Sequence, residues 1–207
     1  MLPFVLRRYG GAVALSPSTD CILLHEYSVC ATFTLNGHPI RFPRRSCTTV
    51  KTSDLCDQYP DSIRVLAPIF QDFGGKNDFE GRAFTLKCFE DNSRIKEISS
   101  LPGHGRVLVV DGGGSDRYAL FGDVIAEDLV KNGWAGVMIY GYIRDKAALR
   151  DMPIAIKALG TSPRKTVKRN EGQIGITVEF AGHTIADGDQ LFGDDDGVVL
   201  LNELSAS

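Results

Sequence analysis

The fold class is indicated most clearly by residues 106–145, RVLVVDGGGSDRYALFGDVIAEDLVKNGWAGVMIYGYIRD. This stretch holds two apolar runs, 107–111 and 136–143, that are rich in β-branched residues and bounded by turn residues, which predicts two buried strands. Between them, residues 117–132 carry apolar side chains at helical spacing and end at Asn132-Gly133, which predicts a helix. A strand, a helix and a strand within about forty residues predict a βαβ unit with a right-handed crossover.

The flanking sequence extends this unit into a mixed α/β layer fold. Thr52-Ser53-Asp54 is typical of a helix start, because these residues accept hydrogen bonds from the first N–H groups of a helix. Alternating or continuous apolar runs predict further strands at 83–89, 154–159, 175–180 and 198–201, and helical spacing predicts short helices at 92–101 and 146–152.

Composition excludes two classes of protein. The chain has 207 residues, 43% of them apolar and 24% charged, which is typical of a globular protein with a real core. No apolar run approaches the roughly 20 residues that cross a bilayer, so a membrane-spanning protein is excluded. The net charge of −3 argues against a dedicated nucleic-acid binder, because such domains are usually basic.

The first 50 residues differ in charge from the rest. They hold five arginines, no lysine and two acids, a net charge of +3, against −6 for residues 51–207. We therefore interpret residues 1–50 as an N-terminal extension of uncertain order, and residues 51–207 as the folded domain. The basic run Arg41–Arg45 is interpreted as a solvated tail, with contact to RNA or an acidic partner as the alternative.

Cysteine usage favours a reducing compartment. Five cysteines without a C-x-x-C pair indicate free thiols and a cytoplasmic protein, and a metal shared by Cys21, His25 and Cys30 is the less favoured interpretation. The arginine pair Arg7-Arg8, with no acid before Asp20, is the weak sign of an organellar transit segment.

Three features that carry chemistry follow the predicted strands. The glycine-rich run 111–115 would let backbone amides approach an anion, although a structural tight turn explains it equally well. Gly122-Asp123 would open a helix, whose unpaired N–H groups can hold a carboxylate or phosphate. Arg144-Asp145 follows the second strand of the βαβ unit, where ligands of α/β sheets gather.

The chemistry of the last two features is complementary. Arg144 offers a planar, bidentate grip on a carboxylate, and Asp145 offers a hard oxygen to Mg²⁺ or Mn²⁺. Each feature alone has an ordinary structural explanation: Asp123 as a residue of a helix start, and the Arg-Asp pair as a surface ion pair. Because one helix and one strand return the chain to the same sheet edge, we expect the features to share one pocket.

Residues 52–201 resemble the RraA-like family, which contains the regulator of ribonuclease activity A and the class II 4-hydroxy-4-methyl-2-oxoglutarate aldolases. The matching stretches occur in order along about three quarters of the chain. They are TSDLCD (52–57), FGG (73–75), TLKCFEDN (85–92), RVLVVDGGGS (106–115), ALFGD (119–123), NGWAGVMIYGYIRD (132–145) and GDDDGVV (193–199).

The resemblance implies a swivelling β/β/α domain with mixed sheets and flanking helices, assembled as a homotrimer or hexamer. It implies a divalent-metal-dependent lyase that cleaves 4-hydroxy-4-methyl-2-oxoglutarate to pyruvate, with oxaloacetate decarboxylation as a side reaction. Asp145 would ligate Mg²⁺ or Mn²⁺. Arg144 and the helix start at Gly122, Asp123, Val124 and Ile125 would bind the 2-keto acid substrate, with Asp123 or the metal activating a water and Arg144 stabilising the enolate.

The same family implies an alternative function, a non-catalytic regulator that inhibits an endoribonuclease by binding it or an associated helicase. Members of this branch can carry a non-acidic residue after the arginine. Because Asp145 is acidic here, the metal position favours the enzyme, whereas TSDLCD, FGG and KCFEDN look closest to the regulators. Neither branch requires a membrane or direct contact with nucleic acid.

Overall fold

The computed structural model describes residues 33–35, 38–40 and 50–201. The chain divides into two units, residues 1–46 and 47–207, and the second contains the βαβ region. In the first unit, β1 (Phe33–Leu35) and β2 (His38–Ile40) pair antiparallel. The predictions for the rest of residues 1–50, including the order of the extension, the transit segment, the Arg41–Arg45 run and the cluster of Cys21, His25 and Cys30, lie outside the described residues.

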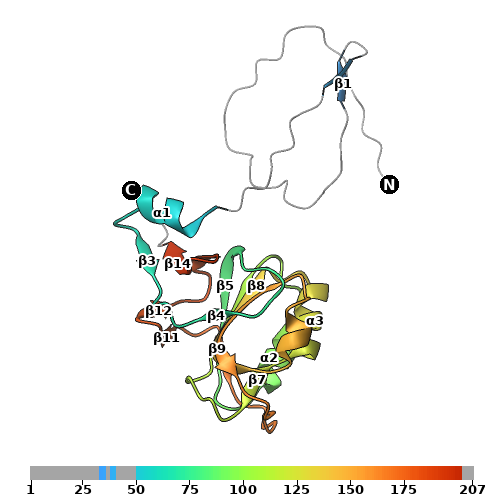
Figure 1. Ribbon diagram of the computed structural model, residues 1–207, viewed down its shortest axis with the longest axis vertical. Coiled ribbons are helices and arrows are strands. Elements are labelled where there is room, and N and C mark those ends of the chain that lie inside the picture. The colour runs from blue at the N-terminus through green and yellow to red at the C-terminus, as the bar shows by residue number, and fades with distance from the viewer. Residues whose placement is uncertain (1–32, 36–37, 41–49, 202–207) are drawn as a thin grey trace, which may run out of the picture. The chain divides into compact units, whose positions relative to one another are not determined.

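The second unit is built on one mixed sheet of ten strands (Figure 1). Its strands are β3 (Ile63–Val65), β4 (Gln71–Asp72), β5 (Phe79–Lys87), β6 (Val107–Asp111), β7 (Ala119–Phe121), β8 (Gly136–Ile143), β9 (Ala155–Thr161), β10 (Gln173–Ile174), β13 (Gln190–Gly193) and β14 (Val198–Leu201). The order along the main path is β3-β14-β13-β5-β6-β8-β9-β4, with β10 beside β5 and β7 beside β8.

The parallel centre of the sheet carries the predicted βαβ unit. Strands β5, β6, β8 and β9 run parallel, so their carboxyl ends meet at one edge. Strands β3, β14 and β13 extend this centre antiparallel beyond β5, and β4 closes the other side against β9.

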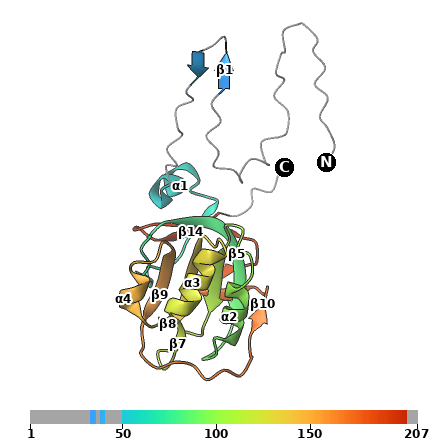
Figure 2. The same ribbon diagram turned by 90° about the vertical axis from the view of Figure 1, so that its right-hand side faces the viewer.

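Helices and a small hairpin cover the two faces of the sheet. The helices are α1 (Thr52–Gln58), α2 (Ser93–Ser99), α3 (Asp123–Lys131) and α4 (Lys146–Leu149). Figure 2 shows α2 and α3 lying across one face of the sheet. On the other face lies the antiparallel hairpin of β11 (Val178–Phe180) and β12 (His183–Ile185). The result is a layered β/β/α domain, as expected.

Each layer interface has its own apolar core. Side chains of α2 and α3, such as Ile98 and Leu129, pack with Leu108 and Ile139 of the sheet. On the opposite face, Phe180 and other hairpin residues pack with residues of β6 and β8. The strands β6 and β8 are therefore buried on both faces, which explains why their sequences are continuous apolar runs rather than alternating ones.

The predicted helix at 117–132 is wrong in its first part. Residues Ala119–Phe121 form β7, a fully buried strand parallel to the end of β8, and α3 begins only at Asp123. Three consecutive apolar residues fit a helix face and a buried strand equally well, so periodicity alone could not separate the two. Gly122 provides the break between them.

Candidate functional site

The first part of the site is the start of α3. Gly122 is the N-cap residue in an extended conformation, and Asp123 lies in the first turn, as the Gly-Asp pair predicted. The N–H groups of the first helical turn lack acceptors within the helix, so they favour an anion. The N–H of Val124 donates to Asp123 Oδ1 at 2.7 Å and thus already has an acceptor.

The second part is the turn after β8. Arg144 Nε lies 3.0 Å from Asp145 Oδ2, and the two side chains are 39% and 36% exposed. Asp145 precedes α4 and has left-handed backbone angles, φ 60° and ψ 34°. The Arg144 N–H donates to the carbonyl of Phe121 at 2.9 Å, which joins this turn to the end of β7. Both side chains can therefore reach solvent at the sheet edge.

The two parts meet at Gly122. A Cβ atom at this position would lie 2.8 Å from Asp145 Oδ2 and 3.3 Å from Arg144 Cγ. Only a glycine lets the backbone of the helix start approach the carboxylate this closely. The features predicted from sequence at Gly122-Asp123 and Arg144-Asp145 therefore lie in contact. In the sequence, 21 residues (123–143) lie between Gly122 and Arg144.

A cavity of about 270 Å³ opens in front of the α3 start. It is strongly basic, because four of its side chains are cationic and Asp123 is its only acid. It is lined by Asn92, Lys96, Ala119, Phe121, Gly122, Asp123, Val124, Ile125, Arg144, Lys165, Thr166 and Lys168. A neighbouring hollow contains Asp145, and Arg144 lines both spaces. The arrangement suits a small polyanion that reaches from the lysines to the Arg144–Asp145 pair.

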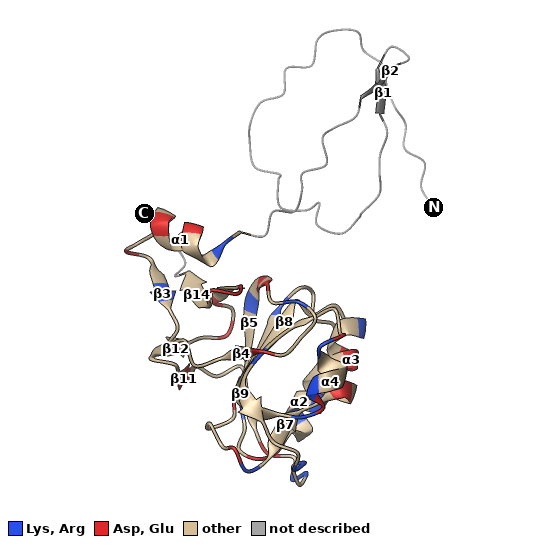
Figure 3. Ribbon diagram, in the orientation of Figure 1, with Lys and Arg blue, Asp and Glu red and all other residues tan. Residues whose placement is uncertain are grey.

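Five polar lining residues were not predicted from sequence: Asn92, Lys96, Lys165, Thr166 and Lys168. Three of them belong to residues 162–172, the segment between β9 and β10, which we call the strap. Blue positions along this loop, below β7 in Figure 3, mark its basic residues. The run PRKTVKR, residues 163–169, is a sequence signal for anion binding that could have identified them.

The glycine-rich run after β6 is a structural turn. The N–H groups of Gly112 and Gly114 both donate to the carbonyl of Tyr140, at 3.0 and 3.1 Å. The N–H of Gly113 donates to Asp111 Oδ1 at 3.0 Å. These amides are engaged within the fold, so the structural explanation of this run is favoured over anion binding. Nearby, Arg117 pairs with Glu90 at 2.6 Å.

The residues present fit a hard divalent cation held by one protein ligand. Within the described ranges, no group of three or more His, Cys, Asp or Glu side chains could hold a metal ion. Asp145 is half-exposed, and the missing Cβ of Gly122 leaves space beside Oδ2. Mg²⁺ usually keeps several waters and binds through one or two carboxylates, so a single aspartate beside an open hollow is a suitable donor set.

Comparison with known proteins settles the family. The model of the RraA-like family, described as Aldolase/RraA, matches residues 52–200. The chain belongs to this RraA-like family. A protein of Alkalilimnicola ehrlichii, provisionally named 4-hydroxy-4-methyl-2-oxoglutarate aldolase, is 53% identical over 152 residues, which are 73% of this chain and 94% of the relative.

Two solved structures share the fold but carry other names. The RNA-processing inhibitor RraA from Thermus thermophilis is 38% identical, with a TM-score of 0.72 over 76% of this chain and 98% of that one. An S-adenosylmethionine:2-dimethylmenaquinone methyltransferase from Geobacillus kaustophilus is 43% identical, with a TM-score of 0.71 over 76% and 99%. Because three names occur on one fold, the activity has to be argued from the site.

Proposed function

We propose that the protein is a divalent-metal-dependent lyase that cleaves 4-hydroxy-4-methyl-2-oxoglutarate into two molecules of pyruvate. The observation that carries this proposal is the contact of Gly122 with the Arg144–Asp145 pair at the mouth of a basic cavity. The name of the 53% identical relative supports the same reaction. The substrate is a dianion, which matches the excess of cationic side chains in the cavity.

The chain's own residues bind and orient the substrate. Arg144 grips the carboxylate next to the 2-oxo group, together with the N–H groups at the start of α3. Asp145 would hold Mg²⁺ or Mn²⁺, which would supply a Lewis acid for the negative charge that develops on the 2-oxo oxygen. The lysines Lys165 and Lys168 face the far carboxylate across the cavity.

Asp123 acts as the general base. Through a water, it accepts the proton of the C4 hydroxyl, and the C3–C4 bond breaks as the C4 carbonyl forms. The bonding electrons move to the C1–C3 fragment, which leaves as the enolate of pyruvate, stabilised by the Arg144 guanidinium. Return of the proton to C3 completes the second pyruvate. Loss of CO₂ from oxaloacetate would generate the same enolate, so that side activity is part of the proposal.

The test is pyruvate release from 4-hydroxy-4-methyl-2-oxoglutarate and from oxaloacetate by the purified full chain. Activity should require Mg²⁺ or Mn²⁺ and disappear with a chelator. Asp145→Asn should abolish it, whereas Asp151→Asn, which changes an exposed carboxylate six residues later, should leave it intact. Metal-independent activity, or full activity in Asp145→Asn, would refute the metal assignment.

The likeness to RraA favours one second candidate function, inhibition of an endoribonuclease through direct contact with it or its helicase. Residues 51–207 are acidic, so a basic partner surface would be complementary. A pull-down that is lost at high salt and unchanged by Asp145→Asn would support this function. Trimeric or hexameric assembly stays a prediction, which light scattering of the purified chain would check.

A further inference from the structure

The strap crosses the site with little support from packing. It runs from β9 to β10 past the ends of β7 and α2 (Figure 2). Of its eleven residues only Ser162 and Thr166 are buried, and Val167 is 65% exposed. A segment with so few buried side chains has little hydrophobic energy to hold it, so its position depends on hydrogen bonds.

Those bonds fall at three places along the strap. At its start, the Ser162 N–H donates to Ile143 O at 2.8 Å, and the Ala119 N–H donates to Arg164 O at 2.7 Å. In the middle, the Thr166 hydroxyl donates to Asn92 Oδ1 at 2.8 Å. The last third, after Lys168, is held mainly by Asp91.

Asp91 is a fully buried carboxylate that lies next to Asn92, the N-cap residue of α2. Its Oδ2 accepts the N–H groups of Arg169 at 2.8 Å and Glu171 at 3.0 Å. Its Oδ1 accepts the N–H and the hydroxyl of Ser93, at 2.8 and 2.6 Å. One ionised group therefore joins the start of α2 to a segment about 80 residues later, through four short bonds.

The surroundings of Asp91 keep it ionised. Burial alone would raise its pKa, but the N–H groups of Glu171, Ser93 and Arg169 and the Ser93 hydroxyl stabilise the carboxylate and hold the pKa at about 2. The group is thus charged at every physiological pH, and its hydrogen bonds keep their full strength.

The cavity-lining lysines of the strap lie between these attachments. Lys165 and Lys168 flank Thr166 and precede Arg169 by four residues and one residue. Both are exposed and long, so their ammonium groups bind a ligand only as well as the backbone beneath them is fixed. Asp91 itself is not among the cavity-lining residues, so any effect on ligand binding has to pass through the strap or through Asn92 and Lys96 at the start of α2.

We propose that Asp91 is a positioning residue, which fixes the strap so that Lys165 and Lys168 bind the substrate carboxylate remote from Asp145. The proposal rests on the proposed function for the identity of the substrate, and deepens it by assigning selectivity for a second carboxylate to a buried group outside the cavity. Arg144 and the α3 start, which bind the pyruvyl end, are independent of the strap's last third.

The test compares two non-cleavable ligands that differ only in the remote group, pyruvate and 2-oxoglutarate, titrated calorimetrically against the Mg²⁺-loaded full chain. The wild type should bind 2-oxoglutarate more tightly. Asp91→Asn removes the charge but keeps the size, and should reduce this preference by about 10-fold while pyruvate affinity stays the same, as expected for losing a charge-assisted contact. Amide hydrogen exchange at residues 165–171 should become faster.

Two further variants make the result decisive. Thr166→Val removes the middle attachment and should reduce the preference in the same direction, which covers the case in which Asp91→Asn does not fold. Asp194→Asn removes another buried carboxylate that accepts backbone N–H bonds away from the cavity, and should leave the preference unchanged. An unchanged preference in both Asp91→Asn and Thr166→Val, or an equal loss of pyruvate binding, would overturn the proposal.

Failure of the lyase assignment would look different. Suppose that the wild type released no pyruvate but still preferred 2-oxoglutarate, and that Asp91→Asn lost this preference. The positioning role of Asp91 would then be supported and the lyase assignment would be refuted. In an active wild type, oxaloacetate cleavage by Asp91→Asn should show a raised KM with kcat little changed, which a general loss of folded protein would not produce.

Discussion

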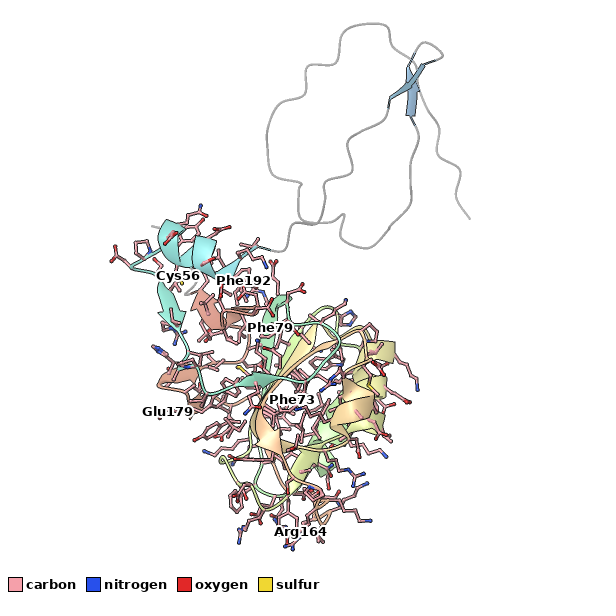
Figure 4. All side chains as sticks on the ribbon, in the orientation of Figure 1. Cys56, Phe73, Phe79, Arg164, Glu179 and Phe192 are labelled. Carbon is pink, nitrogen blue, oxygen red and sulfur yellow. The ribbon has the colours of Figure 1, made fainter. Side chains whose placement is uncertain are left out.

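Two buried aspartates, Asp91 and Asp194, hold opposite ends of the domain by the same chemistry. Each accepts backbone N–H groups from a segment far away in sequence: Asp91 from the strap, and Asp194 from Thr52 at the start of α1, at 2.8 Å. Figure 4 shows the two ends, with Arg164 of the strap at one and Cys56 of α1 at the other.

The two ends differ in what supports the bonds. On α1, Leu55 packs with Phe192 and Val199 in an apolar cluster, so hydrophobic contact and the carboxylate act together. The strap has no comparable cluster and exposes its lysines instead. A segment held mainly by hydrogen bonds keeps most of its side chains available for a ligand, whereas a segment held by packing buries them in the core.

The largest contrast we expect is between the thiols of the two ends. Burial, and then the charges of Asp91 and Asp111, raise the pKa of Cys88 to about 12, whereas Cys56 on α1 is half-buried. Because burial both disfavours the Cys88 thiolate and blocks access to it, a thiol reagent at pH 8 should modify Cys56 at least about 100-fold faster than Cys88. Mass spectrometry of labelled peptides measures both rates; equal rates would contradict the difference in environment.

A pair of glycine variants should separate function from stability. In Gly122→Ala the new Cβ meets the mobile end of Asp145, so we expect pyruvate release to fall about 100-fold with the melting temperature nearly unchanged. In Gly193→Ala, beside Asp194, the new Cβ would clash with the Phe79 ring, which should cost about 1–3 kcal/mol of stability.

Activity assays and thermal melts of both glycine variants provide the measurement. A Gly122→Ala protein with full activity would show that the close approach of helix start and carboxylate is unimportant. A Gly193→Ala protein that lost activity without losing stability would contradict the assignment of stability to the α1 end and activity to the end that carries the cavity.

Asp194→Asn should destabilise the domain without affecting the reaction. The carboxylate also accepts the Thr52 hydroxyl at 2.7 Å and the Asp196 N–H at 3.0 Å, so removing its charge should cost about 2–3 kcal/mol in the free energy of unfolding. Urea unfolding measures the loss, and kcat per folded molecule should match the wild type. Thr52→Val, which removes one of these bonds, should cost less than Asp194→Asn; a larger cost would contradict the account.

The smallest expected effect is a pH dependence that belongs to Asp91. Its pKa is about 2 in the folded protein against 3.8 for the unperturbed group, so the unfolded chain takes up the proton first as the pH falls. The carboxylate's contribution is therefore fully present above about pH 4 and is lost between about pH 4 and pH 2, about 2 kcal/mol in all.

Urea unfolding of the wild type and of Asp91→Asn at pH 5, 4 and 3 tests this dependence. The difference in stability between the two proteins should shrink as the pH falls, because the wild type alone loses the ionised group. A constant difference over this range would show that the carboxylate is not the source of the stabilisation.

Local pattern predicted the parts of this fold that are continuous in sequence. The bounds of β8 at 136–143 and β14 at 198–201 match the predictions. A helix does begin at Thr52, but its N-cap is Lys51 without a side-chain cap, and the Thr52 hydroxyl donates to Asp194 instead of capping the helix. The contact between Gly122 and Asp145 followed from the rule that parallel strands end at one edge. The position of the strap could not be predicted from the sequence, because the strap has no hydrophobic periodicity and its partner Asp91 lies about 80 residues earlier.

The left-handed backbone at Asp145 has a consequence for how this scaffold can evolve. At φ 60° an asparagine or a glycine is tolerated nearly as well as an aspartate, whereas a β-branched residue is strained. A single substitution at Asp145 would therefore remove the proposed metal ligand with little strain on the backbone. The proposed lyase and a non-catalytic binding protein would then differ by one nucleotide in the codon of residue 145.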